Sequence, residues 1–189
     1  MEDQPLDRRV QRTRQLLRDA LFELVLERGY EGIAVGDITE RANLGRTTFY
    51  LHYRDKEELL KASIKALMQE LQHAVAPRAE ETCSYLMQST RIFQHVARQQ
   101  QLYRALLSES GPAHVGDLIR NYFARLYQQY IFEVLNPAGN APWSEELVAA
   151  HAAGSLFGLI SWWLNHESSL SAEEMGEIYC QLLGIAREE

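Results

Sequence analysis

Residues 32–60 read GIAVGDITERANLGRTTFYLHYRDKEELL, and this stretch decides the fold. It contains two short helical segments, Val35–Ala42 and Arg46–His52, which are separated by a turn at residues 43–45. Each segment is too short to be stable alone, so both must pack on their neighbours. Two short helices joined by a three-residue turn that contains glycine are typical of a helix-turn-helix motif. We expect its core to consist of Val35, Ile38, Ala42, Leu44 and Phe49.

The helical period of apolar residues continues on both sides of this motif, and no strand-like alternation bounded by turn residues occurs. The helices expected outside the motif are Arg8–Arg28, Lys56–Val75, Ala79–Ala97, Gln100–Ser108, Ala113–Leu135, Glu145–Asn165 and Ala172–Arg187. Their expected boundary residues are Asp7, Gly29, Asp55 with Glu58, Ser144, and Ser171 with Glu174. Residues 136–142 read NPAGNAP and are the clearest loop. The pattern therefore predicts an all-α fold of nine helices.

Charge is unevenly distributed along the 189 residues, which carry a formal net charge of −7. Five arginines fall within residues 8–18 with no acidic residue among them. A second basic group comprises Arg41, Arg46, Arg54 and Lys56. Phosphates respond to basic surface within a Debye length of about 8 Å, so the acidic total does not exclude nucleic acid. The arginines at 8–18 are equally compatible with an ordinary solvated helix face.

The sequence does not support the classes of membrane proteins and secreted proteins. No uninterrupted apolar run reaches the roughly 18 residues that a membrane span needs, and the charged N-terminus lacks the apolar stretch of a secretory signal. Cys83 and Cys180 lie far apart and form no metal-ligand pair, so we expect reduced core residues in a cytoplasmic protein, although a disulfide between them stays open.

The motif and the helix before it together resemble the TetR family of bacterial transcriptional regulators (TetR/AcrR type). Residues 42–56 read ANLGRTTFYLHYRDK, and residues 20–30 read ALFELVLERGY. The resemblance covers residues 12–61 in register, and the nine-helix layout fits the family over the whole chain. It implies a helix-turn-helix DNA-binding domain at residues 1–56 and a ligand-sensing and dimerisation domain at 57–189. It implies no enzyme activity, cofactor or metal.

The resemblance also places the DNA-binding residues, which are Thr13, Arg46, Thr47, Thr48, Tyr50, His52 and Lys56. The first residues of a recognition helix reach base edges in the major groove. Arg46 can pair bidentately with guanine, and the methyl groups of Thr47 and Thr48 can contact thymine. The other four match positions that contact phosphates in the family. Phosphate contacts position a protein on DNA, whereas base contacts specify the sequence.

Three positions depart from the family pattern. Ala34 stands where a capping Ser or Thr is usual, Gly36 where a basic or polar side chain is frequent, and Gly45 where the family has Ser. Glycine is tolerated at a helix N-cap but offers no side-chain contact. We therefore expect base discrimination to rest on residues 46–48, and the operator sequence stays open.

The second domain is expected to pair with a copy of itself, because residues 145–165 are apolar almost all round and rich in small residues. A central helix in a monomer would have the same composition. The expected dimer residues are Ala150, Ala153, Gly154, Phe157 and Gly158.

The second domain is also expected to contain a pocket for an unknown, apolar or aromatic small-molecule effector. The side chains expected to line this pocket are Met87, Phe93, His95, Tyr103, Tyr122, Phe123, Tyr127, Phe157 and Trp162. Each of these side chains, taken alone, is more typical of the core than of a pocket.

The function that this reading favours is a ligand-responsive repressor that binds a two-fold symmetric operator as a homodimer, without a membrane partner. Two alternatives belong to other classes. An adaptor with the same fold would act through a partner protein. An enzyme would need a catalytic motif, and the candidate Glu70-x-x-His73 lacks the second such pair and the two further glutamates that a di-iron bundle requires.

Overall fold

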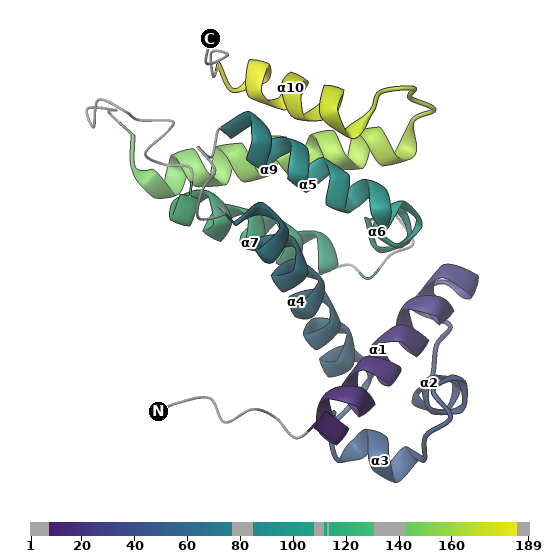
Figure 1. Ribbon diagram of the computed structural model, residues 1–189. Coiled ribbons are helices and arrows are strands. Elements are labelled where there is room, and N and C mark those ends of the chain that lie inside the picture. The colour runs from purple at the N-terminus through teal and green to yellow at the C-terminus, as the bar shows by residue number, and fades with distance from the viewer. Residues whose placement is uncertain (1–7, 77–84, 108–111, 113, 131–142, 185–189) are drawn as a thin grey trace.

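The computed structural model describes residues 8–76, 85–107, 112, 114–130 and 143–184, which form nine helices and no strand. Figure 1 shows a small group of helices, α1–α3, joined by the long helix α4 to a larger helical bundle. The all-α prediction is confirmed for this part of the chain. The predictions made for Asp7, Cys83, residues 79–84, 108, 113 and 131–142, and Arg187 lie outside the described residues.

Helix α1 (Arg8–Arg28) ends as predicted. Gly29 has φ +73°, and its N–H donates to the Val25 carbonyl at 3.0 Å. Such a left-handed residue closes a helix at little steric cost when it is glycine. Helix α2 (Val35–Arg41) starts after Ala34, whose N–H donates to the Asp37 carboxylate at 2.7 Å. The Asp37 carboxylate thus forms the reciprocal half of a capping box, while the alanine side chain offers no acceptor to the first N–H groups of the helix.

In the turn into α3 (Arg46–Tyr50), the left-handed backbone conformation falls on Asn43 and not on Gly45. Asn43 has φ +53°, whereas Gly45 is extended with φ −74° and serves as the N-cap. Asparagine tolerates the left-handed region because its short side chain bonds locally. Ile38 and Phe49 are fully buried, Ala42 is nearly so, and Val35 and Leu44 pack beside them, which confirms the predicted core.

Helix α4 (Lys56–Val75) has the predicted bounds and leads from the α1–α3 group into the bundle (Figure 1). Its capping box is only half formed. The Asp55 carboxylate accepts from the Glu58 N–H at 2.8 Å, but the Glu58 carboxylate accepts from the Arg54 N–H at 2.8 Å instead of from Asp55.

The bundle contains α5 (Tyr85–Arg98), α6 (Gln100–Leu107), α7 (Val115–Tyr130), α9 (Glu145–Asn165) and α10 (Ala172–Leu182). Helix α7 lies along α9, and α10 lies on α5 (Figure 1). The α5–α10 contact is close, because a Cβ on Gly176 would stand 2.9 Å from the Thr90 backbone. The last helix ends at Leu182 within the described residues, short of the predicted Arg187, and Gly184 two residues later has φ +71°.

Helix α9 is apolar along most of its length, although it contains no uninterrupted apolar run of about 18 residues. Its length and mean hydropathy match those of a membrane-crossing helix, with 33% of the apolar window buried inside the chain. Length and composition also fit the core helix of a water-soluble bundle, and α9 does pack on α7 and α6. The exposure of the individual residues of α9 therefore shows which of its faces the bundle covers.

Candidate nucleic-acid interface

The recognition helix α3 turns one face inward and leaves the other open. Phe49 is fully buried and Tyr53 is 8% exposed, so both are packing residues. Tyr50 is 58% exposed, and Arg46 and Thr47 are also exposed. Of the remaining predicted residues in this segment, Thr48 and His52 are half-buried. The open face thus brings together the base-reading candidates predicted at residues 46–48.

Two predicted phosphate contacts are engaged inside the protein. The Thr13 hydroxyl, half-buried on α1, donates to the Arg9 carbonyl at 2.9 Å. The Lys56 ammonium lies 4.4 Å from the centre of the Tyr30 ring and donates to the carbonyls of Tyr30 and Glu31 at 3.2 and 3.3 Å. An ammonium has three N–H donors, so one stays available in this position. In this structure the Lys56 side chain therefore holds the loop between α1 and α2, at Tyr30 and Glu31, against the start of α4.

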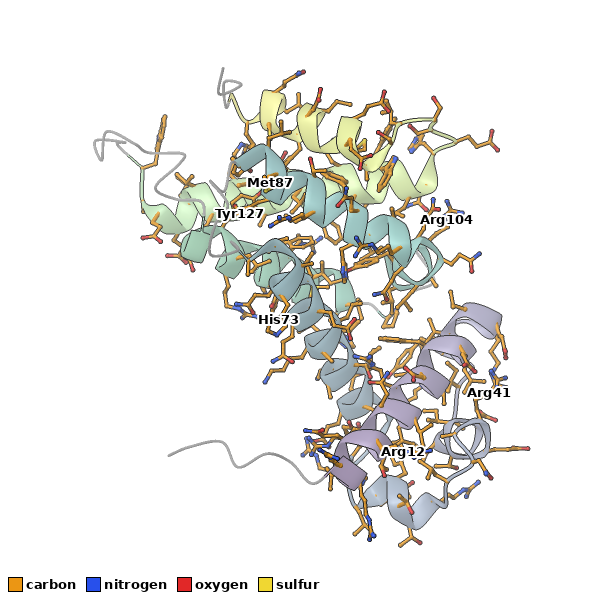
Figure 2. The ribbon with its side chains drawn as sticks, viewed as in Figure 1. Arg12, Arg41, His73, Met87, Arg104 and Tyr127 are labelled. Carbon is orange, nitrogen blue, oxygen red and sulfur yellow. The ribbon has the colours of Figure 1, made fainter. Side chains whose placement is uncertain are left out.

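Ion pairing divides the basic residues into two sets. Arg41 contacts Glu23 at 3.1 Å and Glu27 at 2.7 Å, and its hydrogen bond lowers the pKa of the Glu27 carboxyl. Arg54 is paired with Glu58 at 3.0 Å. Half of the second basic group predicted from the sequence is therefore neutralised within the fold. Figure 2 shows Arg41 beside α2 and Arg12 on the N-terminal half of α1.

Exposed arginines of α1 form a cationic surface on the N-terminal part of that helix, where Arg14 is close enough to Tyr53, just after α3, to act on the pKa of its hydroxyl. Arg8, Arg12 and Arg14 are exposed and form no ion pair with another described residue. Arg18 differs, because it is half-buried and its Nη1 contacts the Glu70 carboxylate of α4 at 2.7 Å. That pair links α1 to the bundle. The Glu70 carboxylate is thereby engaged in an ion pair, and among the described residues no group of three or more His, Cys, Asp or Glu side chains could hold a metal ion.

Helix α9 presents an outer stripe of small and apolar residues, which we define as Leu147, Ala150, His151, Gly154, Gly158 and Trp162. A Cβ on Gly154 or on Gly158 would meet no atom within 4 Å, so both glycines face open space. Three of the predicted dimer residues therefore lie on this stripe. The other two do not, because Ala153 is 2% exposed and Phe157 is half-buried beneath the Arg120 guanidinium at 4.5 Å.

The predicted pocket residues are dispersed through the bundle. A cavity of about 10 Å³ lies among Val75, Gln88, Ile92, Phe123, Leu126, Tyr127 and Leu156. Phe123 and Tyr127 are its only predicted members. Phe93 is core, while Met87 and Tyr122 are half-buried, and the Tyr122 hydroxyl bonds to Gln72 at 2.9 Å. Trp162 is 45% exposed and stacks on His166, whereas Trp163 points inward against Phe93. An apolar helix gives no sequence signal for choosing between adjacent tryptophans.

Two of the predicted pocket residues carry buried polar atoms without a hydrogen-bond partner. These atoms are His95 Nε2 on α5 and Tyr103 Oη on α6, and the two rings lie 5.9 Å apart. Burial lowers the pKa of His95, with a smaller opposite effect from Glu70. More than nine in ten buried polar groups in proteins are hydrogen-bonded. This pair therefore has capacity for one more polar group.

Comparison with known proteins agrees with this geometry. Residues 17–63 match the model of bacterial regulatory proteins of the tetR family, and residues 84–184 match that of a transcriptional regulator C-terminal region. The HTH-type transcriptional regulator YxbF of Bacillus subtilis (strain 168) is 27% identical over 98% of this chain and 48% of its own length. The HTH-type transcriptional repressor DhaR of Mycobacterium sp. (strain GP1) is 26% identical over 62% of this chain and 61% of its own.

The chain thus spans about half the length of the first of these relatives and under two thirds of the second. A TetR transcriptional regulator from Streptococcus agalactiae 2603V has the same fold, with a TM-score of 0.68 over 94% of this chain and 96% of that one at 24% identity. The family models cover residues 17–63, which include α2, α3 and parts of α1 and α4, and residues 84–184, which include the bundle. The chain belongs to the TetR family of bacterial transcriptional regulators.

Proposed function

We propose that this protein is a ligand-responsive repressor that binds a two-fold symmetric operator as a homodimer in the bacterial cytoplasm. The observation that carries the proposal is the open face of α3 beside the exposed arginines of α1. Arg46 and the two threonines after it would read base edges, and Arg8, Arg12 and Arg14 would neutralise phosphates. The relative DhaR is named a transcriptional repressor, which supports repression as the direction of regulation.

The outer stripe of α9 supports the homodimer. The exposed stripe repeats small residues at positions 150, 154 and 158, which allows a second helix to approach closely. Among the described residues nothing covers it. A two-fold axis through this stripe would duplicate α3 and so create two reading helices for two half-sites. Burial of the stripe against a second copy of the chain would explain the high mean hydropathy of α9 without requiring a membrane.

An effector would act through the bundle. The unpaired atoms of His95 and Tyr103 would bond its polar group, and the bundle would have to open well beyond its present cavity of about 10 Å³ to enclose its body. Displacement of α4 would then reach the α1–α3 group through the Arg18–Glu70 ion pair. A ligand produces such a shift only through different affinities for the two states.

DNA binding is tested directly by fluorescence anisotropy on duplexes from the DNA that flanks the protein's own gene. We expect log K to fall linearly with log salt, with a slope of roughly −0.9 for each phosphate neutralised. Arg12→Ala should make that slope less steep by about one phosphate. Absence of binding to every promoter fragment would contradict the regulator proposal and favour an adaptor that acts through a partner protein.

A further inference from the structure

Gly36 lies directly beneath the side chain of Arg46. A Cβ placed on Gly36 would stand 2.7 Å from Arg46 Nη2, 3.5 Å from Cζ and 3.7 Å from Nε. The guanidinium of the first residue of α3 therefore rests on the first turn of α2. Because carbon and nitrogen do not approach to 2.7 Å without bonding, every residue type other than glycine at position 36 would displace the guanidinium from this place.

Charge also draws Arg46 towards this turn. Asp37 follows Gly36, and the pKa of its carboxyl is lowered first by the bond from the Ala34 N–H, then by Arg28, and further by the positive charge of Arg46. The carboxylate is already occupied by Arg28 Nη2 at 2.8 Å and by the Ala34 N–H at 2.7 Å. Arg46 forms no ion pair with any described residue, so its N–H donors stay free for a ligand.

We propose that Gly36 is a specificity-determining residue, because it seats the Arg46 guanidinium in one orientation for reading a base pair. The inference rests on the proposed function, in which Arg46 contacts DNA. Bidentate recognition of guanine requires the guanidinium plane to be aligned with the base edge. An exposed arginine loses rotamer freedom when it is ordered on DNA, and a preformed seat reduces that loss. Gly36 thereby acts as a positioning residue and makes no base contact of its own.

The chain offers matched glycine variants for the test. In Gly36→Ala the new methyl group meets the far end of a flexible side chain, so the fold is retained while Arg46 moves. In Gly45→Ala, on the same surface, the new methyl group meets only Thr48 Oγ1 at 4.0 Å and leaves Arg46 in place. Arg46→Lys keeps the charge but lacks the planar fork that pairs with guanine.

The experiment is selection of bound sequences from a randomised DNA duplex library, with thermal unfolding of each variant as the check on folding. Wild type should prefer guanine at one position of each half-site. G36A, R46K and R46A should each reduce that preference about 10-fold at this position, within the range of one good bidentate pair. G45A should keep it, and G36A added to R46A should change nothing further.

A folded G36A protein that selects the wild-type sequence, while R46A does not, would overturn the inference and leave the proposed function intact. Additive effects of G36A and R46A on the same base position would also overturn it, because they would show independent action. Failure of the wild-type protein to enrich any sequence would contradict the proposed function itself, and the inference with it.

Discussion

The open face of α3 and the outer stripe of α9 are two surfaces that the chain leaves uncovered, and their chemistry is opposite. The α3 face offers Arg46, two threonines and Tyr50, close to the exposed arginines of α1. The α9 stripe carries two glycines in open space, an alanine, and large apolar side chains such as Leu147, which is 56% exposed. One surface suits a polyanion with polar base edges, and the other suits an apolar helix that packs closely.

In the proposed function, this difference in chemistry means that DNA binding requires both surfaces, one to contact the DNA and one to pair two copies of the chain. In the proposed function a single α3 would offer only residues 46–48 of its first turn for base contacts, which is too few to specify a long operator. Duplication through α9 would double the reading surface and fix the spacing of the two copies. The apolar stripe would therefore act on DNA affinity without touching DNA. The predictions below separate the two surfaces, from the largest expected effect to the smallest.

Blocking the α9 stripe should have the largest effect on DNA binding. Gly158→Arg places a long charged side chain where a partner helix would approach, while the free chain has open space there. We expect a folded monomer whose operator affinity is about 100-fold lower or weaker still, because linkage of the two half-site contacts is lost. Sedimentation and anisotropy measure both quantities. Asn121→Arg on the exposed part of α7 is the matched control, and a dimeric G158R protein would contradict the assigned surface.

Removing the reading arginine should weaken specific binding without changing assembly. Arg46→Ala is expected to cost about 1–3 kcal/mol at the preferred operator through the lost bidentate contact. Binding to a scrambled duplex should fall much less, because it depends on the summed phosphate contacts. Competition anisotropy with the two duplexes gives the ratio. Equal losses on both duplexes would assign Arg46 to the phosphates instead of the bases.

The glycines of α9 and α10 should respond differently to the same methyl group. In Gly176→Ala the new Cβ would lie 2.9 Å from the Thr90 backbone, so the α5–α10 contact must open. Overpacking of this kind typically costs about 1–3 kcal/mol. The same change at Gly154 meets open space and should raise the unfolding free energy of the monomer by about 0.5–1 kcal/mol, because alanine is the better helix former. Denaturant unfolding in the G158R background, which removes the dimer, compares the two; similar losses would refute the assigned environments.

His95 should make stability depend on pH. Burial places its folded pKa below the ordinary value of about 6.5, so the unfolded chain binds a proton first as the pH falls. Stability should therefore be complete at pH 7.5 and decline below about 6.5, with a slope of at most roughly 1.4 kcal/mol per pH unit. His95→Gln should flatten the profile, whereas the exposed His73→Gln on α4 should not. Parallel profiles for wild type and H95Q would exclude this role.

Arg41 should be the basic residue of the helix-turn-helix whose loss matters least for DNA. Its guanidinium is already held by Glu23 and Glu27 on the α1 side of α2. Exposed ion pairs contribute little to stability, so Arg41→Ala should fold normally. Operator affinity measured by anisotropy should stay within about twofold of wild type, against the much larger loss for R46A. A loss as large as that of R46A would show that Arg41 leaves its carboxylates to bind DNA.

Sequence patterns predicted local structure well, but they predicted poorly the sites that side chains from different helices form together. The bounds of α1, α4 and α9 and the helix-turn-helix core followed from apolar period and caps, which are encoded within a few residues. The neutralisation of Arg41 could not be predicted, because Glu23 and Glu27 come from another helix. The choice between Trp162 and Trp163 depended on rotation of an apolar helix, which its own sequence does not fix. The contact of Gly36 with Arg46 needed the α2–α3 crossing.

The central claim is that two copies joined through α9 place two α3 helices on one operator. The most direct test is the mass of the complex between the wild-type protein and its selected duplex, measured by sedimentation together with the symmetry of the selected sequence. The account predicts two or another even number of chains per duplex and an inverted repeat whose half-site centres lie about one helical turn apart, roughly 34–36 Å. One chain per duplex on a sequence without two-fold symmetry would contradict it.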